Sequence, residues 1–151
     1  MNPELKSLYQ EVILDHNRNP RNFRRMDDAD ASLEGFNPLC GDRYTFFVKM
    51  DGERIVDVAF KGSGCAISKA SASVMGALLK GKTKSEADAM FTQFHELVTG
   101  KLDAEAHADA LGKLAAFGGV SEFPARVKCA SLPWHTMHGL LESQREPVST
   151  E

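Results

Sequence analysis

Three cysteines are the residues of this sequence best suited to chemistry, and they stand at positions 40, 65 and 129 of 151. An odd number of cysteines, with no export signal recognisable at the N-terminus, argues against a disulfide framework and predicts a reducing, cytoplasmic setting. Such cysteines are core residues, metal ligands or nucleophiles. The residues around each cysteine distinguish between these roles.

Cys40 lies in the segment Asn-Pro-Leu-Cys-Gly-Asp (37–42), where proline and glycine indicate a tight turn before a strand. Cys40 and Asp42 are two positions apart, so their side chains point to the same side of an extended segment. A thiolate and a carboxylate side by side repel each other unless a cation lies between them. The pair therefore indicates metal ligands or a proton-shuttling pair; an aspartate that only caps the turn is the simpler alternative.

Cys65 follows Gly-Ser-Gly (62–64) and is expected to open a helix. The glycines allow a sharp turn that leaves the thiol accessible, and a helix N-terminus stabilises a thiolate. A phosphate-binding turn is a minor alternative, because the third glycine of a dinucleotide fingerprint is missing.

Cys129 has two cations close by in the sequence, Arg126 and Lys128. They would favour a thiolate or steer an anionic sulfur species. The alternative is that both cations are solvated and that Cys129 faces the core.

Three thiols and one carboxylate make four ligands, and a tetrahedral Cys₃Asp set suits Zn²⁺. Asp42 is the ligand most easily displaced, which would leave an open position on the metal. The gaps between Asp42, Cys65 and Cys129 are too wide for a zinc-finger pattern, so spacing alone gives only weak support.

The elements that would position these residues follow from apolar spacing and capping signals. An amphipathic helix is expected over 3–16, capped by Asn2, with an apolar face of Leu5, Leu8, Tyr9, Val12 and Ile13. Strands are expected over 44–50 and 55–61, joined by the Asp-Gly turn at 51–52, with a third strand over 31–36. Val56, Val58 and Phe60 alternate with Asp57 and Ala59, which predicts one buried face.

The rest of the chain is expected to be helical. The predicted helices cover 65–80, the segment opened by the capping box at 83–86, 103–114, and a last helix that includes Cys129, contains Pro133 as a kink or late start, and runs to about 145. The tail, 146–151, is expected to be flexible. We therefore predict one α+β domain over 1–151, in which a small antiparallel sheet of about three strands is packed on one face by several helices.

Composition excludes several classes of function. The formal net charge is -3, which disfavours nucleic acid as a partner, and no apolar run approaches the roughly 18 residues that span a membrane. The basic run from Arg18 to Arg25 is expected to be a solvated loop, with a docking surface as the alternative. A hydrolase with a Cys–His pair is a remote alternative, and its imidazole would have to come from His16, His95, His107, His135 or His138.

The sequence resembles the U-type iron–sulfur assembly family, which comprises NifU N-terminal, IscU and SufU proteins, over about residues 3–145. The resemblance is carried by Leu-Tyr-Gln-Glu-Val-Ile-Leu-Asp-His (8–16), Asn-Pro-Arg-Asn (19–22), Asn-Pro-x-Cys-Gly-Asp (37–42), Gly-x-Gly-Cys-Ala-Ile-Ser (62–68) and Arg-x-Lys-Cys-Ala (126–130). The last three are similar to that family's ligand motifs, in the same order.

Within the family the chain is most similar to the SufU branch. Lys128 stands where IscU proteins carry a histidine, and an extra segment occupies about 100–123. The Leu-Pro-Pro-Val-Lys run of IscU proteins is replaced by Phe-Pro-Ala-Arg-Val at 123–127.

The SufU resemblance implies zinc held by Cys40, Asp42, Cys65 and Cys129. It also implies that Cys40 accepts persulfide sulfur from a SufS-type, PLP-dependent cysteine desulfurase, for passage to downstream iron–sulfur assembly proteins. Arg126, with Lys128, would lie at the desulfurase interface. The alternative within the family is a scaffold that binds iron and a [2Fe–2S] cluster on the same ligands.

Overall fold

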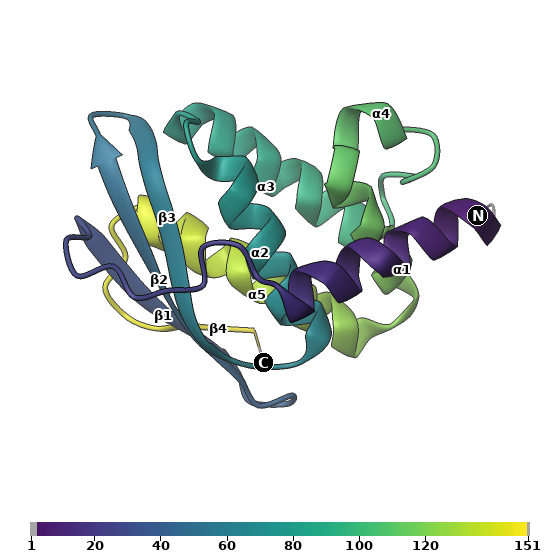
Figure 1. The fold of residues 1–151 in the computed structure, drawn as a ribbon, viewed down its shortest axis with the longest axis horizontal. Coiled ribbons are helices and arrows are strands. Elements are labelled where there is room, and N and C mark those ends of the chain that lie inside the picture. Colours follow the sequence, from purple (N-terminus) through teal and green to yellow (C-terminus); the bar gives the residue numbers. More distant parts are fainter. Residues whose placement is uncertain (1–2, 151) are drawn as a thin grey trace.

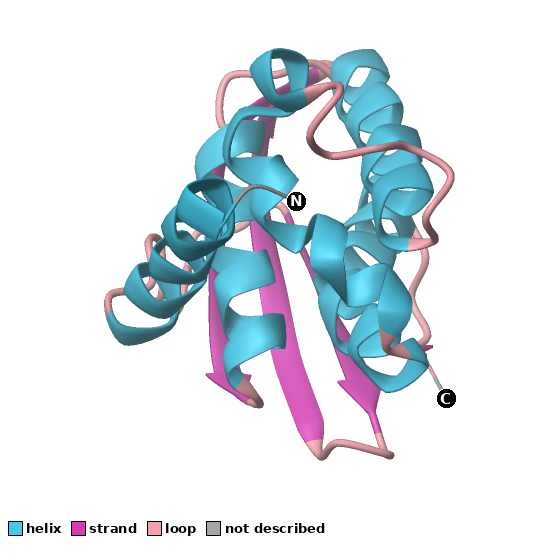
Figure 2. Ribbon diagram, turned by 90° about the vertical axis from the view of Figure 1, so that its right-hand side faces the viewer, coloured by secondary structure: helices cyan, strands magenta, loops and turns pink. Residues whose placement is uncertain are grey.

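In the computed structural model, which describes residues 3–150 apart from the Leu5 side chain, helices cover one face of a four-stranded sheet (Figures 1 and 2). The strands are β1 (Ala31–Asn37), β2 (Asp42–Asp51), β3 (Arg54–Ser63) and β4 (Val148–Ser149), in the order β3-β2-β1-β4. The first three are antiparallel neighbours, whereas β4 pairs in parallel with β1. The predicted α+β class is confirmed, but the sheet is mixed and has one strand more than expected.

The helices form two layers on that face. Helices α2 and α5 pack on the sheet, α1 packs on α2, and α3 packs on α5, with η1 between α1 and α3. Their bounds are α1 (Pro3–Arg18), α2 (Ala66–Leu79), α3 (Lys84–Val98), α4 (Ala108–Leu111), the 3₁₀ helix η1 (Gly112–Glu122) and α5 (Pro124–Leu141). None of these helices is both long and apolar enough to cross a membrane.

The β2–β3 hairpin confirms the predicted Asp-Gly turn but not the full alternation of β3. Gly52 adopts a φ of +61°, a conformation that glycine favours in such turns. A register shift after Lys49 leaves Val56 out of the ladder, so Ile55 is buried and Val56 is 49% exposed. Such a bulge reverses the facing of residues beyond it. The prediction of a buried Val56 is therefore wrong, whereas Val58 and Phe60 are buried as expected.

The loop over 19–30 covers the other face of the sheet (Figure 1). It pairs with the free edge of β3 through an isolated bridge between Phe23 and Phe60. Met26 and Ala29 then pack on Phe47. Three arginines of the basic run form ion pairs with carboxylates: Arg21 with Asp15, Arg24 with Asp57 and Arg25 with Asp27.

The capping box predicted from the sequence is confirmed at the level of individual atoms. Thr83 Oγ1 accepts the Glu86 N–H at 3.1 Å, and the Glu86 carboxylate accepts the Thr83 N–H at 3.1 Å, which makes the predicted capping box. Trp134 is a packing residue, because its ring stacks on Phe94 at a centroid distance of 4.6 Å.

Other local expectations differ from the structure. The helix expected over 103–114 is wrong: Gly112, with φ of +56°, ends the four-residue α4, and η1 follows. The last helix runs from Pro124 and accommodates Pro133 inside it. Part of the tail expected to be flexible forms β4. On α1, Leu8 is 54% exposed instead of buried, and the Asn2 cap lies outside the described residues.

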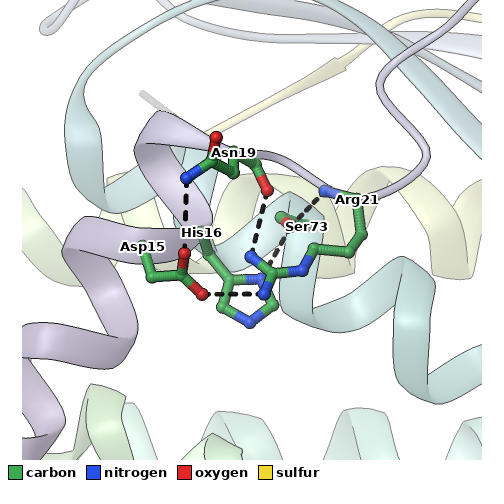
Figure 3. A network of polar contacts seen from close by, with 5 residues as sticks. All are labelled: Asp15, His16, Asn19, Arg21 and Ser73. Atoms are coloured by element: carbon green, nitrogen blue, oxygen red, sulfur yellow. Dashed lines mark hydrogen bonds and ion pairs between the residues drawn. The ribbon is translucent and has the colours of Figure 1, made fainter.

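A buried histidine joins the end of α1 to α2 (Figure 3). His16 is 1% exposed, and its Nδ1 lies 2.7 Å from Ser73 Oγ, which also accepts the Arg21 N–H at 2.8 Å. The His16 Nε2 atom has no partner among the described residues. Burial, reinforced by the charge of Arg21, lowers the pKa of His16 to about 4. Desolvation of His16 therefore outweighs the favourable effect that the negative end of the α1 dipole would have on a charged imidazole.

Acidification should destabilise the protein through His16. Its pKa is about 4 when folded and 6.5 in its ordinary state, so the unfolded chain binds more protons and the free energy of unfolding falls as pH drops through this window. The full effect is on the order of 3 kcal/mol. Urea unfolding of His16→Gln should show a weaker pH dependence than the wild type, with the exposed His107→Gln as control. Equal pH dependence in all three proteins would contradict this origin.

Candidate metal centre

The turn between β1 and β2 presents Cys40 to solvent. The Asn37 carbonyl oxygen accepts the N–H groups of Cys40 and Gly41 at 3.3 and 2.9 Å, and Gly41 adopts a φ of +73°. Glycine takes this left-handed conformation without steric cost. Leu39, beside Cys40, is 67% exposed. The thiol of Cys40 is therefore held on a tight, exposed turn.

Asn37 is a residue of the site that sequence reasoning missed. It is fully buried, its Oδ1 accepts the Leu39 N–H at 3.3 Å, and its Nδ2 donates to Cys129 Sγ at 3.6 Å. One side chain thus ties the Cys40 turn to α5. In the sequence, Asn37 starts an Asn-Pro turn and the motif Asn-Pro-x-Cys-Gly-Asp, and neither feature reveals a partner 92 residues away.

Asp42, the first residue of β2, is buried and faces the loop that leads into α2. Its Oδ1 accepts the Cys65 N–H at 2.8 Å, and its Oδ2 lies 3.9 Å from Cys65 Sγ. Gly64 makes this close approach feasible, because a Cβ there would lie 2.5 Å from Asp42 Oδ1 and 2.5 Å from Tyr44 Oη. The aspartate that the sequence placed beside Cys40 thus also contacts Cys65.

Cys65 is the N-cap residue of α2. Its Sγ accepts the Ser68 N–H at 3.4 Å, and Ser68 Oγ is hydrogen-bonded to Tyr44 Oη at 2.8 Å. Burial raises the pKa of Tyr44, so its phenol stays neutral and can donate. The predicted position of Cys65 at the start of a helix is confirmed.

Cys129 lies on α5, is 3% exposed, and has its Sγ 3.1 Å from Cys40 Sγ. Burial raises the pKa of the Cys129 thiol, and the contact with Cys40 raises it further. This burial agrees with the alternative given for Cys129, in which the thiol faces the core. Arg126 is exposed and stacks on Phe123, with its Cζ 4.5 Å from the ring centroid.

The four candidate ligands come from three separate segments that meet at one end of the sheet. One ligand atom from each of Cys40, Asp42 and Cys129 lies within 4.8 Å of the others, close to the span of two zinc–sulfur bonds. Cys65 Sγ lies outside this compact group but is in contact with Asp42. Two thiols and a carboxylate in this arrangement form a possible metal site, and soft sulfur donors favour zinc or iron.

An α+β fold with three cysteines gathered at one end of the sheet defines a class of protein. Comparison with known proteins identifies that class. The family model for the NifU-like N-terminal domain matches residues 8–130. The chain is 43% identical over 136 residues to the zinc-dependent sulfurtransferase SufU of Bacillus subtilis, covering 90% of each chain. It is 39% identical to the iron–sulfur cluster assembly scaffold protein IscU of Streptococcus pyogenes, covering 89% of this chain and 82% of the relative.

Solved structures agree with the sequence comparisons. A crystal structure described as a SUF-system iron–sulfur cluster assembly scaffold protein, from Fervidobacterium islandicum, superimposes with a TM-score of 0.81 at 39% identity. That match covers 89% of this chain and 97% of the other. The chain belongs to the NifU-like N-terminal domain family, the family that the motifs around the three cysteines indicated, and the function of that family is iron–sulfur cluster assembly.

Gly64→Ala should damage the site, because its Cβ would meet Asp42 and Tyr44 at distances that atoms do not adopt. We expect a loss of about 1–3 kcal/mol of stability and weaker binding of a metal ion at the site. Gly119→Ala is the matched control, since a Cβ there meets nothing within 4 Å. Thermal unfolding and zinc titration check both variants, and wild-type behaviour of Gly64→Ala would contradict the close packing.

Proposed function

We propose that this protein is a zinc-dependent sulfur acceptor of iron–sulfur cluster assembly, and that it acts in the cytoplasm. The observation that carries the proposal is the contrast between Cys40, exposed on its turn, and its buried neighbours Asp42 and Cys129. A thiol that accepts sulfur must be accessible to the partner that donates it. Side chains that hold a metal ion need no such access and are better held in place by burial. The similarity to a zinc-dependent sulfurtransferase supports the same choice.

The residues present fit a zinc ion. Cys40, Asp42, Cys65 and Cys129 would hold it, with three sulfur donors and one oxygen donor, the set that a tetrahedral zinc site accepts. Bound zinc would supply a thiolate at Cys40 and protect it from oxidation. The raised pKa of Cys129 gives the ion a further role, because the buried thiol would lose its proton only when a cation is present.

The proposed reaction is a thiol–persulfide exchange at Cys40. The Cys40 thiolate attacks the outer sulfur of the donor's persulfide, the donor S–S bond breaks, and the donor cysteine leaves as a thiolate. The product is a persulfide on Cys40, with no net oxidation or reduction. The donor would be a SufS-type, PLP-dependent cysteine desulfurase, and downstream iron–sulfur assembly proteins would receive the sulfur.

Docking of the desulfurase would use the exposed residues beside the ligands. Leu39 precedes Cys40 in the turn, and Phe123, at the start of α5, is 47% exposed and carries the Arg126 guanidinium on its ring. Lys128 adds a second cation next to Cys129 in the sequence. Aromatic residues and arginine are enriched at protein–protein interfaces, so Phe123 and Arg126 suit such a surface.

A scaffold that assembles a [2Fe–2S] cluster on the same ligands is the second candidate. It is favoured by relatives named as scaffold proteins, including IscU of Streptococcus pyogenes at 39% identity and IscU of Thermotoga maritima at 34% identity. The two candidates differ in the metal that the protein holds.

Elemental analysis should distinguish them. We expect protein purified without oxygen to hold zinc, with little iron or acid-labile sulfide, and we expect a strong zinc chelator to abolish its stimulation of a cysteine desulfurase. Re-addition of zinc should restore the stimulation. Equal amounts of iron and labile sulfide, with a visible absorption spectrum, would instead establish the scaffold.

Cys40→Ser should retain the fold, because residue 40 is exposed, but should lower sulfur acceptance by about tenfold or more. Mass spectrometry after incubation with desulfurase and cysteine detects the added sulfur atom, and circular dichroism checks the fold. His107→Gln is the control, since it changes an exposed residue away from the thiols and should still accept sulfur on Cys40. Full sulfur transfer to Cys40→Ser would exclude the role.

A further inference from the structure

Helices α3 and α5 carry a second group of metal-ligating side chains, away from the thiols. The two helices pack side by side (Figure 1), and Asp88 of α3 lies opposite His138 of α5. Further along, His95 of α3 faces His135 of α5, with ring centroids 6.2 Å apart. The helices therefore run antiparallel, with imidazole and carboxylate groups along their seam.

Three of these side chains converge at one end of the seam. His138 Nδ1 lies 3.5 Å from Asp88 Oδ1, and Glu142 stands four positions after His138, one turn further along α5. One ligand atom from each of the three residues lies within 4.8 Å of the others. One nitrogen and two oxygen donors at this separation can reach a common ion.

The His138 ring is held in place by packing. The Phe91 ring, one turn after Asp88, meets it edge to face, at a centroid distance of 5.3 Å and an interplanar angle of 84°. Both helices are anchored in the core through Phe94 and Trp134, which stack on each other. Ligands on packed helices are positioned before the ion arrives, which lowers the cost of binding it.

The charges around the three residues favour a cation. Asp88 and Glu142 bring two carboxylates close together, and Glu142 is the C-cap of α5, where the helix dipole adds negative potential. Among the residues that the structure describes, His138 alone forms an ion pair with either carboxylate. A divalent cation among the three side chains would offset the charge of the two carboxylates.

The geometry points to a second metal site, formed by Asp88, His138 and Glu142, that takes a divalent first-row transition ion with water in its remaining positions. Cys129 and His138 are nine positions apart on α5, so they face opposite sides of the helix, about 13 Å apart along its axis. The thiol centre offers mainly soft sulfur donors, whereas this site offers only nitrogen and oxygen. The two sites therefore differ in ligand class as well as in place.

Zinc titration of the full chain, followed by calorimetry, tests the second site. We expect one tight equivalent at the thiol centre and one weaker equivalent at the new site. Asp88→Asn and His138→Gln should each weaken only the second step, by at least about tenfold. Cys129→Ser should weaken only the first step, so the two sites can fail independently. In NMR spectra of the histidine rings, the second equivalent should shift the His138 signals.

Matched variants define the outcomes that overturn the site. His107→Gln, a change at an exposed histidine outside the seam, should bind both equivalents normally. A single zinc equivalent in the wild type would overturn the proposal. Loss of the weaker step in a His95→Gln, His135→Gln double variant, with no loss in Asp88→Asn, would also overturn it, because the ion would then lie at the other end of the seam. Circular dichroism confirms that each variant folds.

Discussion

The removal of Asp42 and Cys129 from water is the constraint on which the arrangement at the thiol end of the sheet depends. A buried carboxylate needs a hydrogen-bond donor or a cation, and Asp42 receives the Cys65 N–H at 2.8 Å. The Cys129 Sγ atom accepts a hydrogen bond from the side-chain amide of Asn37. These two contacts lock the β1–β2 turn, the loop before α2 and α5 to one another. Burial raises the pKa of the Cys129 thiol, so a thiolate at this position would need a cation beside it.

Cys40 differs from these buried residues because it is exposed to solvent. The left-handed Gly41 carries the chain around a turn whose tip is exposed, so Cys40 reaches both its buried neighbour and the solvent. The proposed role of Cys40 as a sulfur acceptor depends on this exposure. Helix α5 supports this site with Cys129 and faces α3 with His138, so one helix supplies candidate ligands on two opposite sides.

Much of the fold could be predicted because its signals are local. The Thr83 capping box, the turn at Gly52 and the start of α2 at Cys65 each depend on a few neighbouring residues. The wrong predictions concern features that depend on contacts between segments far apart in the sequence. The bulge that exposes Val56 depends on pairing between strands, and β4 depends on an edge of β1 that lies far from it in the sequence.

The sequence by itself determined the residue types at the candidate site: three thiols and a carboxylate, each in a local setting of turn, cap or helix, in an order that indicated the family. The tertiary structure alone decided which of these side chains are buried and which are exposed to solvent. It buried Asp42 and Cys129, exposed Cys40, and brought in Asn37 from the start of the turn. Burial and contact depend on every segment packed around a residue, and no short stretch of sequence contains that information.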